Sequence, residues 1–267
     1  MEPCWIDSHC HIGMCKSLSE AQVVQHALDN GVGILINVAI DGYSSREVTA
    51  RSERHECVYA TIGIHPHDSE KAKDSDFDWI AENYDRPKVV AIGEIGLDFY
   101  RDYAPRDIQR QVFETQLRFA AQRDIPVVIH SRKAWDDTIG MVKEVASEYP
   151  LKGVFHCWGY GPEEMKPILD LGFYISFPGA LTYENSKKLH TTARRIPLEK
   201  ALIETDAPFI TPAKYKKETP ENLPGYVVET AKTLAFLRDI PLDQLRDSLF
   251  ENTLRCFPKL ALALEKV

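Results

Sequence analysis

Residues 88–94 read KVVAIGE, a short run rich in β-branched residues that ends in a glycine and a glutamate. Runs of this length and composition predict buried β-strands. A second such run, PVVIH at 126–130, ends in a histidine. Between the two lies segment 106–123, where an apolar stripe marked by Val112 and Leu117 predicts a long helix. Strands that alternate with helices pair in parallel, so this strand–helix–strand unit indicates an α/β fold with a parallel sheet.

The same alternation continues in both directions along the chain. Strands are predicted at 4–9, 33–38, 58–63, 88–93, 126–130, 153–156, 172–176 and 200–204. Helices are predicted at 19–30, 106–123, 136–148, 162–171 and 184–195, with two or three more between 226 and 264. The first helix should begin with a capping box, in which Ser19 accepts a backbone hydrogen bond and Gln22 reaches back.

Eight strand–helix units favour a closed TIM (β/α)8-type barrel over an open sheet. The chain has 267 residues, near the roughly 250 typical of one such barrel, so we expect a single domain over residues 1–267. A doubly wound sheet is the alternative. No G-x-G-x-x-G follows the first strand, however, which argues against a dinucleotide-binding fold and an organic cofactor of that kind.

The overall charge limits the kind of nucleic-acid contact to expect. The formal net charge is −8, whereas proteins that coat long duplex DNA carry a basic footprint. A nucleic-acid substrate would therefore be held locally, at a strand end or short segment. A small-molecule or peptide-like substrate fits the charge equally well.

The six cysteines form no C-x-x-C pair and are expected to be reduced, which predicts a cytoplasmic protein. The N-terminus lacks the features of a secretory signal, and no apolar run of about 18 residues predicts a membrane span. We expect no membrane partner, and a monomer by default.

Side chains suited to metal binding or acid–base chemistry follow most of the predicted strands. They are His9 and His11 after the first strand, His65 after the third, Glu94 after the fourth, His130 after the fifth, His156 after the sixth and Asp206 after the eighth. The carboxyl ends of barrel strands meet at one mouth, so these groups should converge. Residues two apart on a strand share a face, so His9 and His11 can act together while Cys10 points away. A single such histidine is more often a core or surface residue, but the joint pattern predicts a site for Zn, Mn or Mg.

The motifs around these residues resemble those of the TatD family of metal-dependent deoxyribonucleases. The motifs are DSHCH at 7–11, GIHPH at 63–67, GEIGLD at 93–98, IHSR at 129–132, FHC at 155–157 and ETDAP at 204–208. Two loops depart from the family pattern, at 158–161 (WGYG) and 214–224. Both border the mouth, so they leave the metal site intact and put the substrate in doubt.

The resemblance implies one to three divalent ions (Mg, Mn or Zn) per chain. His9, His11 and Asp206 would hold the first, His130 and His156 the second, and Glu94 would touch or bridge both. Asp206 would orient or deprotonate a water, and His65 would steady the phosphate or protonate the leaving oxygen. Glu204 is expected to hold a ligand histidine from behind, and Asp7 to act likewise or structurally.

The implied activity is 3′-to-5′ exonuclease cleavage of DNA, with a preference for single-stranded ends. Arg101 and Arg132 follow strand ends and are candidates for phosphate contacts, while Tyr100 and Trp158 are candidates for stacking on bases. The alternative interpretation is that half of such loop residues pack the loops against one another.

Two other functions compete with the nuclease. One is an acyl, ester or C–N hydrolase such as a D-aminoacyl-tRNA deacylase, and the other is a non-catalytic metal-binding protein. Acyl hydrolases of related barrels often bridge their ions with a modified lysine on the fourth strand. Here that strand ends in Glu94, and Lys88 lies at its start, out of reach, which favours the nuclease.

Overall fold

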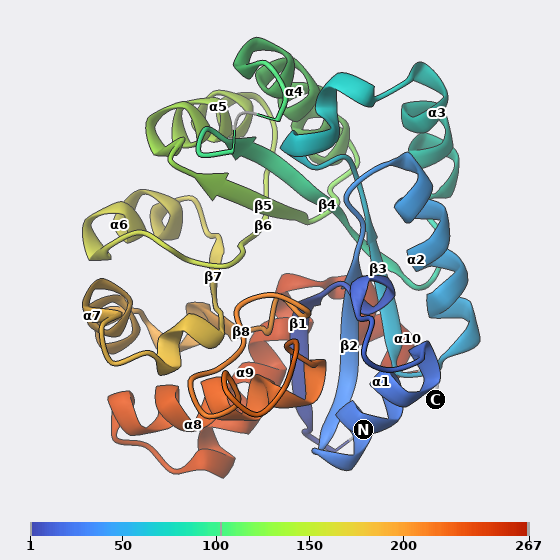
Figure 1. Ribbon diagram of the computed structural model, residues 1–267. Helices are drawn as coiled ribbons and strands as arrows, with labels where there is room; N and C mark the ends of the chain where they lie inside the picture. Colours follow the sequence, from blue (N-terminus) through green and yellow to red (C-terminus); the bar gives the residue numbers. More distant parts are fainter. Residues whose placement is uncertain (1, 102, 266–267) are drawn as a thin grey trace.

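Eight parallel strands form one sheet in which each strand pairs with the next along the chain, in the computed structural model that describes residues 2–101 and 103–265. Figure 1 shows them as a ring of arrows with the helices outside. The strands are β1 (Trp5–Cys10), β2 (Val32–Val38), β3 (Val58–Ile62), β4 (Val89–Asp98), β5 (Val127–Arg132), β6 (Gly153–Phe155), β7 (Tyr174–Phe177) and β8 (Ala201–Ile203). The prediction of a TIM (β/α)8 barrel is confirmed.

The ring closes just beyond the end of β8. Cys10 and Ala207 form an isolated parallel bridge, and the amide of His11 donates to the carbonyl of Ala207 over 2.7 Å. The amide of Asp206 donates in turn to the carbonyl of His9 over 2.9 Å. The first and last motifs of the sequence are therefore joined backbone to backbone.

Helices cover the outside of the ring. They are α1 (Glu20–Asp29), α2 (Gly42–Arg54), α3 (Asp74–Asn83), α4 (Arg106–Gln122), α5 (Trp135–Glu148), α6 (Pro162–Asp170), α7 (Lys187–Arg195), α8 (Val227–Arg238), α9 (Leu242–Cys256) and α10 (Pro258–Leu264). The predicted capping box of α1 is confirmed, because Ser19 and Gln22 bond reciprocally. No helix within residues 2–101 and 103–265 has the length and apolar character needed to cross a membrane.

Several predicted boundaries were wrong. Strand β4 runs to Asp98 rather than Gly93, and it shifts register against β5 between Ile92 and Ile95. Strand β8 ends at Ile203 rather than Glu204, and Asp206 lies in the loop that follows it. Helices α2 and α3 were not predicted at all.

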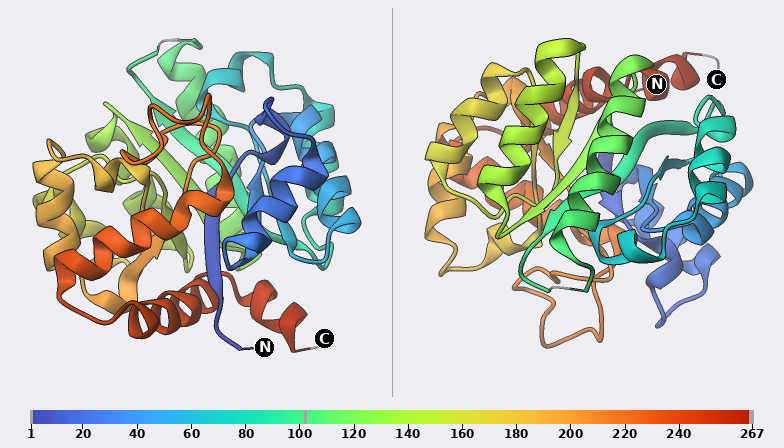
Figure 2. Two further views of the ribbon diagram at one scale, coloured as in Figure 1. Left: turned by 60° about the horizontal axis from the view of Figure 1, so that its bottom comes forward. Right: turned by 90° about the horizontal axis from the view of Figure 1, so that it is seen from above.

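The strand residues alternate between two cores, as the period of two requires. Leu35 and Val127 belong to a cluster shared with helix residues such as Phe113. Ile34 and Val128 belong to a second cluster, shared with Phe257 and Leu260 from the C-terminal segment. This segment therefore covers one end of the barrel. Figure 2 shows both termini at that end, with the loop that follows β8 at the opposite end.

Candidate metal centre

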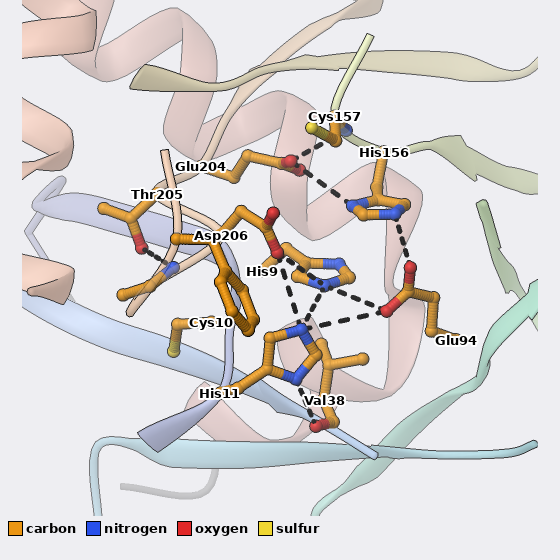
Figure 3. Close-up of polar contacts among 12 residues, drawn as sticks. His9, Cys10, His11, Val38, Glu94, His156, Cys157, Glu204, Thr205 and Asp206 are labelled. Atoms are coloured by element: carbon orange, nitrogen blue, oxygen red, sulfur yellow. Dashed lines mark hydrogen bonds and ion pairs between the residues drawn. The ribbon is translucent and has the colours of Figure 1, made fainter. Parts of the chain in front are cut away.

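The metal-type side chains predicted at the strand ends gather in one place. Three overlapping groups have ligand atoms within 4.8 Å of one another: His9, His11 and Asp206; His9, Glu94 and His156; and His65, Glu94 and His130. Six chain segments supply them, because parallel barrel strands deliver their carboxyl ends to the same mouth. Figure 3 shows His9, His11, His156 and Asp206 turned toward one another, with Glu94 beside them.

His9 and His11 project to the same side of the chain at the end of β1. Their Nε2 atoms lie 3.2 Å apart, and Asp206 Oδ1 lies 3.7 and 3.5 Å from them. Nδ1 of His11 donates to the carbonyl of Val38 over 2.9 Å. In the neutral ring Nε2 of His11 therefore carries a free lone pair directed into the cluster. Cys10 points away, with its thiol on the carbonyl of Ile36.

Glu94 lies between two groups of imidazoles and uses a different oxygen for each. Its Oε1 is 2.7 Å from Nε2 of His156 and 2.8 Å from Nδ1 of His130. Its Oε2 is 3.5 Å from Nε2 of His9 and 3.8 Å from Nε2 of His11. The carboxylate is thus placed to contact two cations at once.

The chemistry of this donor set fits divalent ions. Nδ1 of His130 and Nε2 of His156 lie 3.2 Å apart, as close as the His9–His11 pair. Imidazole nitrogens and carboxylate oxygens converge within a few ångströms here, and a cation among them would satisfy the nitrogen lone pairs and the carboxylate charges together.

Two acidic residues support the cluster from behind. Glu204 lies with Oε1 3.3 Å from Nδ1 of His156 and accepts the amide of Cys157 over 2.7 Å. Asp7 accepts the amide of Thr205 over 2.9 Å and that of His9 over 3.3 Å. Asp7 therefore ties the end of β1 to the loop that carries Asp206, while Glu204 orients a ligand candidate.

The protonation of the site follows from burial and close contacts. Burial by itself would raise the pKa of Glu94, but the nearby imidazoles of His156 and His65 hold that pKa well below its usual value. Burial would likewise raise the pKa of Asp206, but the contact with His11 lowers it below its usual value. Burial holds the pKa of His65 well below its usual value.

His65 has the opposite proton arrangement to His11. Its Nδ1 accepts the amide of His67 over 3.1 Å. In the neutral ring Nε2 of His65 therefore carries the proton, and it lies 3.5 Å from Oε1 of Glu94. A donor N–H suits a contact to an anion better than it suits metal ligation.

A cavity of about 650 Å³ opens above the cluster. Of the predicted substrate contacts, Arg101 and Arg132 line it. Tyr100 is exposed, and its ring centroid lies 4.1 Å from the guanidinium carbon of Arg132.

The expected stacking role of Trp158 does not fit its surroundings. Its side chain borders the cavity but is only 2% exposed. The indole packs edge-to-face against Trp135 and Tyr160. A side chain that is only 2% exposed offers no open face for a base, so Trp158 shapes the cavity wall.

Three residues at the site were missed or given little weight in the sequence. Asp98 is buried beside His130, and Phe209 and Tyr103 are exposed aromatics that line the cavity. The signal for Asp98 was its spacing, since Glu94 and Asp98 share a strand face. Gly96 between them has φ 144°, and a Cβ there would meet the carbonyl of His130.

Comparison with known proteins agrees with this arrangement. Residues 6–258 match the family described as TatD related DNase, which confirms the resemblance seen in the motifs. The chain is 33% identical over 252 residues to the metal-dependent hydrolase YabD of Bacillus subtilis, covering 94% of this chain and 98% of that protein. It is 33% identical over 219 residues to a Citrobacter koseri protein named 3′-5′ ssDNA/RNA exonuclease TatD, a match that covers 81% of this chain and 84% of that protein. The crystal structure of the TatD homologue YjjV from Escherichia coli K12 matches with a TM-score of 0.88 at 30% identity. The match covers 95% of this chain and 98% of that one.

Proposed function

Because the chain belongs to the TatD family of metal-dependent hydrolases, we propose that it is a 3′-to-5′ exonuclease that cleaves phosphodiester bonds at single-stranded DNA ends. The observation that carries the proposal is Glu94, whose two oxygens face separate groups of imidazoles. Two-ion sites of this form suit in-line displacement at phosphorus. A relative of this chain is named as a 3′-5′ exonuclease of ssDNA and RNA.

Some residues would hold the ions and others would take part in the reaction, and Asp206 would do both. His9, His11 and Asp206 would hold one ion, His130 and His156 a second, and Glu94 would contact both. Ions there would offset the charge of the buried carboxylates, polarise the phosphate and lower the pKa of a water.

The protein's own side chains would then move protons and fix the substrate. The Asp206 side chain is 14% exposed toward the mouth and, with its lowered pKa, would accept the proton of the attacking water. Nε2–H of His65 would donate to the phosphate or to the leaving oxygen. Arg101 and Arg132 on the cavity wall would hold phosphates of the retained strand.

Lys88 argues against the acyl-hydrolase alternative. Its Nζ donates to the carbonyls of Ser52, His55 and Glu56 over 2.7–3.0 Å. It also lines a different cavity, together with Leu262 of α10. This lysine is therefore remote from the mouth and unavailable as a bridge between ions.

The test uses the purified protein with Mg²⁺, Mn²⁺ or Zn²⁺, and with chelator, on single-stranded DNA labelled at either end. We expect metal-dependent loss of nucleotides from the 3′ end, abolished in His130→Ala and retained in His190→Ala, which alters a helix histidine bonded to the Leu181 carbonyl. RNA and D-aminoacyl-tRNA are assayed as substrates under the same conditions. Deacylation without DNA cleavage would reject the nuclease in favour of acyl chemistry.

A further inference from the structure

Asp98 ends β4 with a fully buried carboxylate, and each oxygen has its own partners. Oδ2 lies 3.3 Å from Nε2 of His130 and 2.8 Å from Nε2 of His67. Oδ1 accepts the amides of Tyr100 and Arg101 over 2.8 and 3.0 Å. One side chain thus joins the metal centre to the loop beside it.

The Oδ2 contacts decide which nitrogen of His130 faces the cluster. His130 has a carboxylate at each ring nitrogen, Glu94 at Nδ1 and Asp98 at Nε2, and carboxylates only accept hydrogen bonds. A cation bound at Nδ1 would leave the single ring proton on Nε2, where Asp98 accepts it. Nδ1 would then present its lone pair to that cation, beside Oε1 of Glu94, which lies 2.8 Å from it. A neutral His130 with the other tautomer would place a proton where a cation must bind.

The Oδ1 contacts hold the start of the loop between β4 and α4. This loop carries Arg101, which lines the cavity, and Tyr100, over which the Arg132 guanidinium lies at 4.1 Å. Gln109 of α4 holds the same loop from behind, accepting the amide of Asp98 and donating to the carbonyl of Ala104.

We propose that Asp98 is a positioning residue that orients His130 for metal binding with one oxygen and fixes the Tyr100–Arg101 loop for substrate with the other. The second half of this proposal rests on the proposed function. The first half depends only on metal binding, so the two can fail separately.

The variant Asp98→Asn separates the two roles. Its amide oxygen can still accept the Tyr100 and Arg101 amides, which places the NH₂ group against His130. That group donates, so the His130 proton moves to Nδ1. We expect zinc affinity, measured by equilibrium dialysis, to fall by about 10–100-fold, as for other residues that orient metal ligands. On single-stranded DNA at saturating metal, kcat should fall while KM stays near its original value.

The variant Asp98→Ala loses both roles and should also raise KM and speed amide hydrogen exchange at 99–101. The control is Asp76→Asn, which removes a carboxylate that contacts Arg46 and the Lys73 amide on α3. It should leave zinc affinity and KM unchanged. Zinc affinity unchanged in Asp98→Asn would overturn the ligand half of the proposal, and loop exchange unchanged in Asp98→Ala would overturn the other half.

A measurement on the unaltered chain covers the case in which the variants do not fold. Long-range proton–nitrogen NMR of the zinc-loaded protein should show the His130 proton on Nε2, and a proton on Nδ1 would overturn the assignment. An unaltered protein that binds zinc but leaves DNA intact would reject the nuclease function without touching this result.

Discussion

Phe209 is an apolar ring left open to solvent at the edge of the metal centre. It follows Asp206 by three residues, is 51% exposed, and lies edge-on to His11 with ring centroids 6.1 Å apart. Tyr103 stands in a similar relation to His67, with ring centroids 4.7 Å apart. Exposed rings beside the proposed phosphate-binding centre suit stacking on nucleobases, the role that Trp158 is too buried to fill.

Replacing the ring of Phe209 should weaken substrate binding without disturbing the metals. Stacking on an aromatic side chain is worth about 1–3 kcal/mol per base, so Phe209→Ala should raise KM for single-stranded DNA by about 5- to 150-fold. Zinc affinity and kcat should remain close to those of the unaltered chain. Phe236→Ala, on the exposed face of α8, is the control and should change neither constant. An unchanged KM in Phe209→Ala would show that the ring does not contact a base.

At the scale of elements, one carboxylate ties α1 to α2. Glu20, in the first turn of α1, lies 2.7 Å from Arg51, 2.9 Å from Arg54 and 2.9 Å from His55. Burial opposes ionisation of Glu20, but the hydrogen bonds from Arg54 and Arg51 lower its pKa from 4.5 to about 2. The network secures the two helices that flank β2.

The pH dependence of this contribution follows from the lowered pKa. A carboxyl group that ionises more readily in the folded state adds stability above its unfolded pKa, and that stability is lost as the pH falls through the folded value. Glu20→Gln should therefore unfold at a lower urea concentration than the unaltered chain at pH 7, and the gap should narrow between about pH 4.5 and pH 2. Glu82→Gln, an exposed change on α3, is the control. A gap that is constant with pH would contradict the ion-pair account.

The elements that the sequence predicted well are those with strong apolar patterns. The strands were found because runs such as VVAIG are short and β-branched. Helix α2 was missed because its buried face consists largely of small or polar residues, among them Ser45, Thr49 and Ser52, which produce no hydrophobic period. Helix α3 buries only Ile80 and Asn83.

The same reasoning explains what was found and missed at the site. Spacing of two along a strand correctly placed His9 and His11 together. Asp98 was missed because β4 was expected to stop at Gly93, five residues before its end. Whether an aromatic such as Trp158 is open to solvent depends on contacts between distant loops, which a single sequence does not reveal.

At the scale of the whole molecule, the ligand groups gather only when the barrel is complete. His9 and Asp206 come from opposite ends of the chain and meet through the backbone bonds that close the ring. An unfolded chain holds no such site, so bound ions favour the folded state through their binding free energy.

Removing the metal should therefore lower the thermal midpoint. At a free metal concentration of about 100 times Kd, binding to the folded state alone adds about 2.7 kcal/mol. Each kcal/mol shifts the midpoint of a domain of this size by roughly 2–4 °C, so chelation should lower it by about 5–11 °C. Scanning calorimetry with and without chelator measures this shift. Glu94→Gln removes the carboxylate charge that faces both groups of imidazoles, so chelation should lower its thermal midpoint by less. An equal response to chelator in this variant would mean that the ions bind elsewhere on the chain.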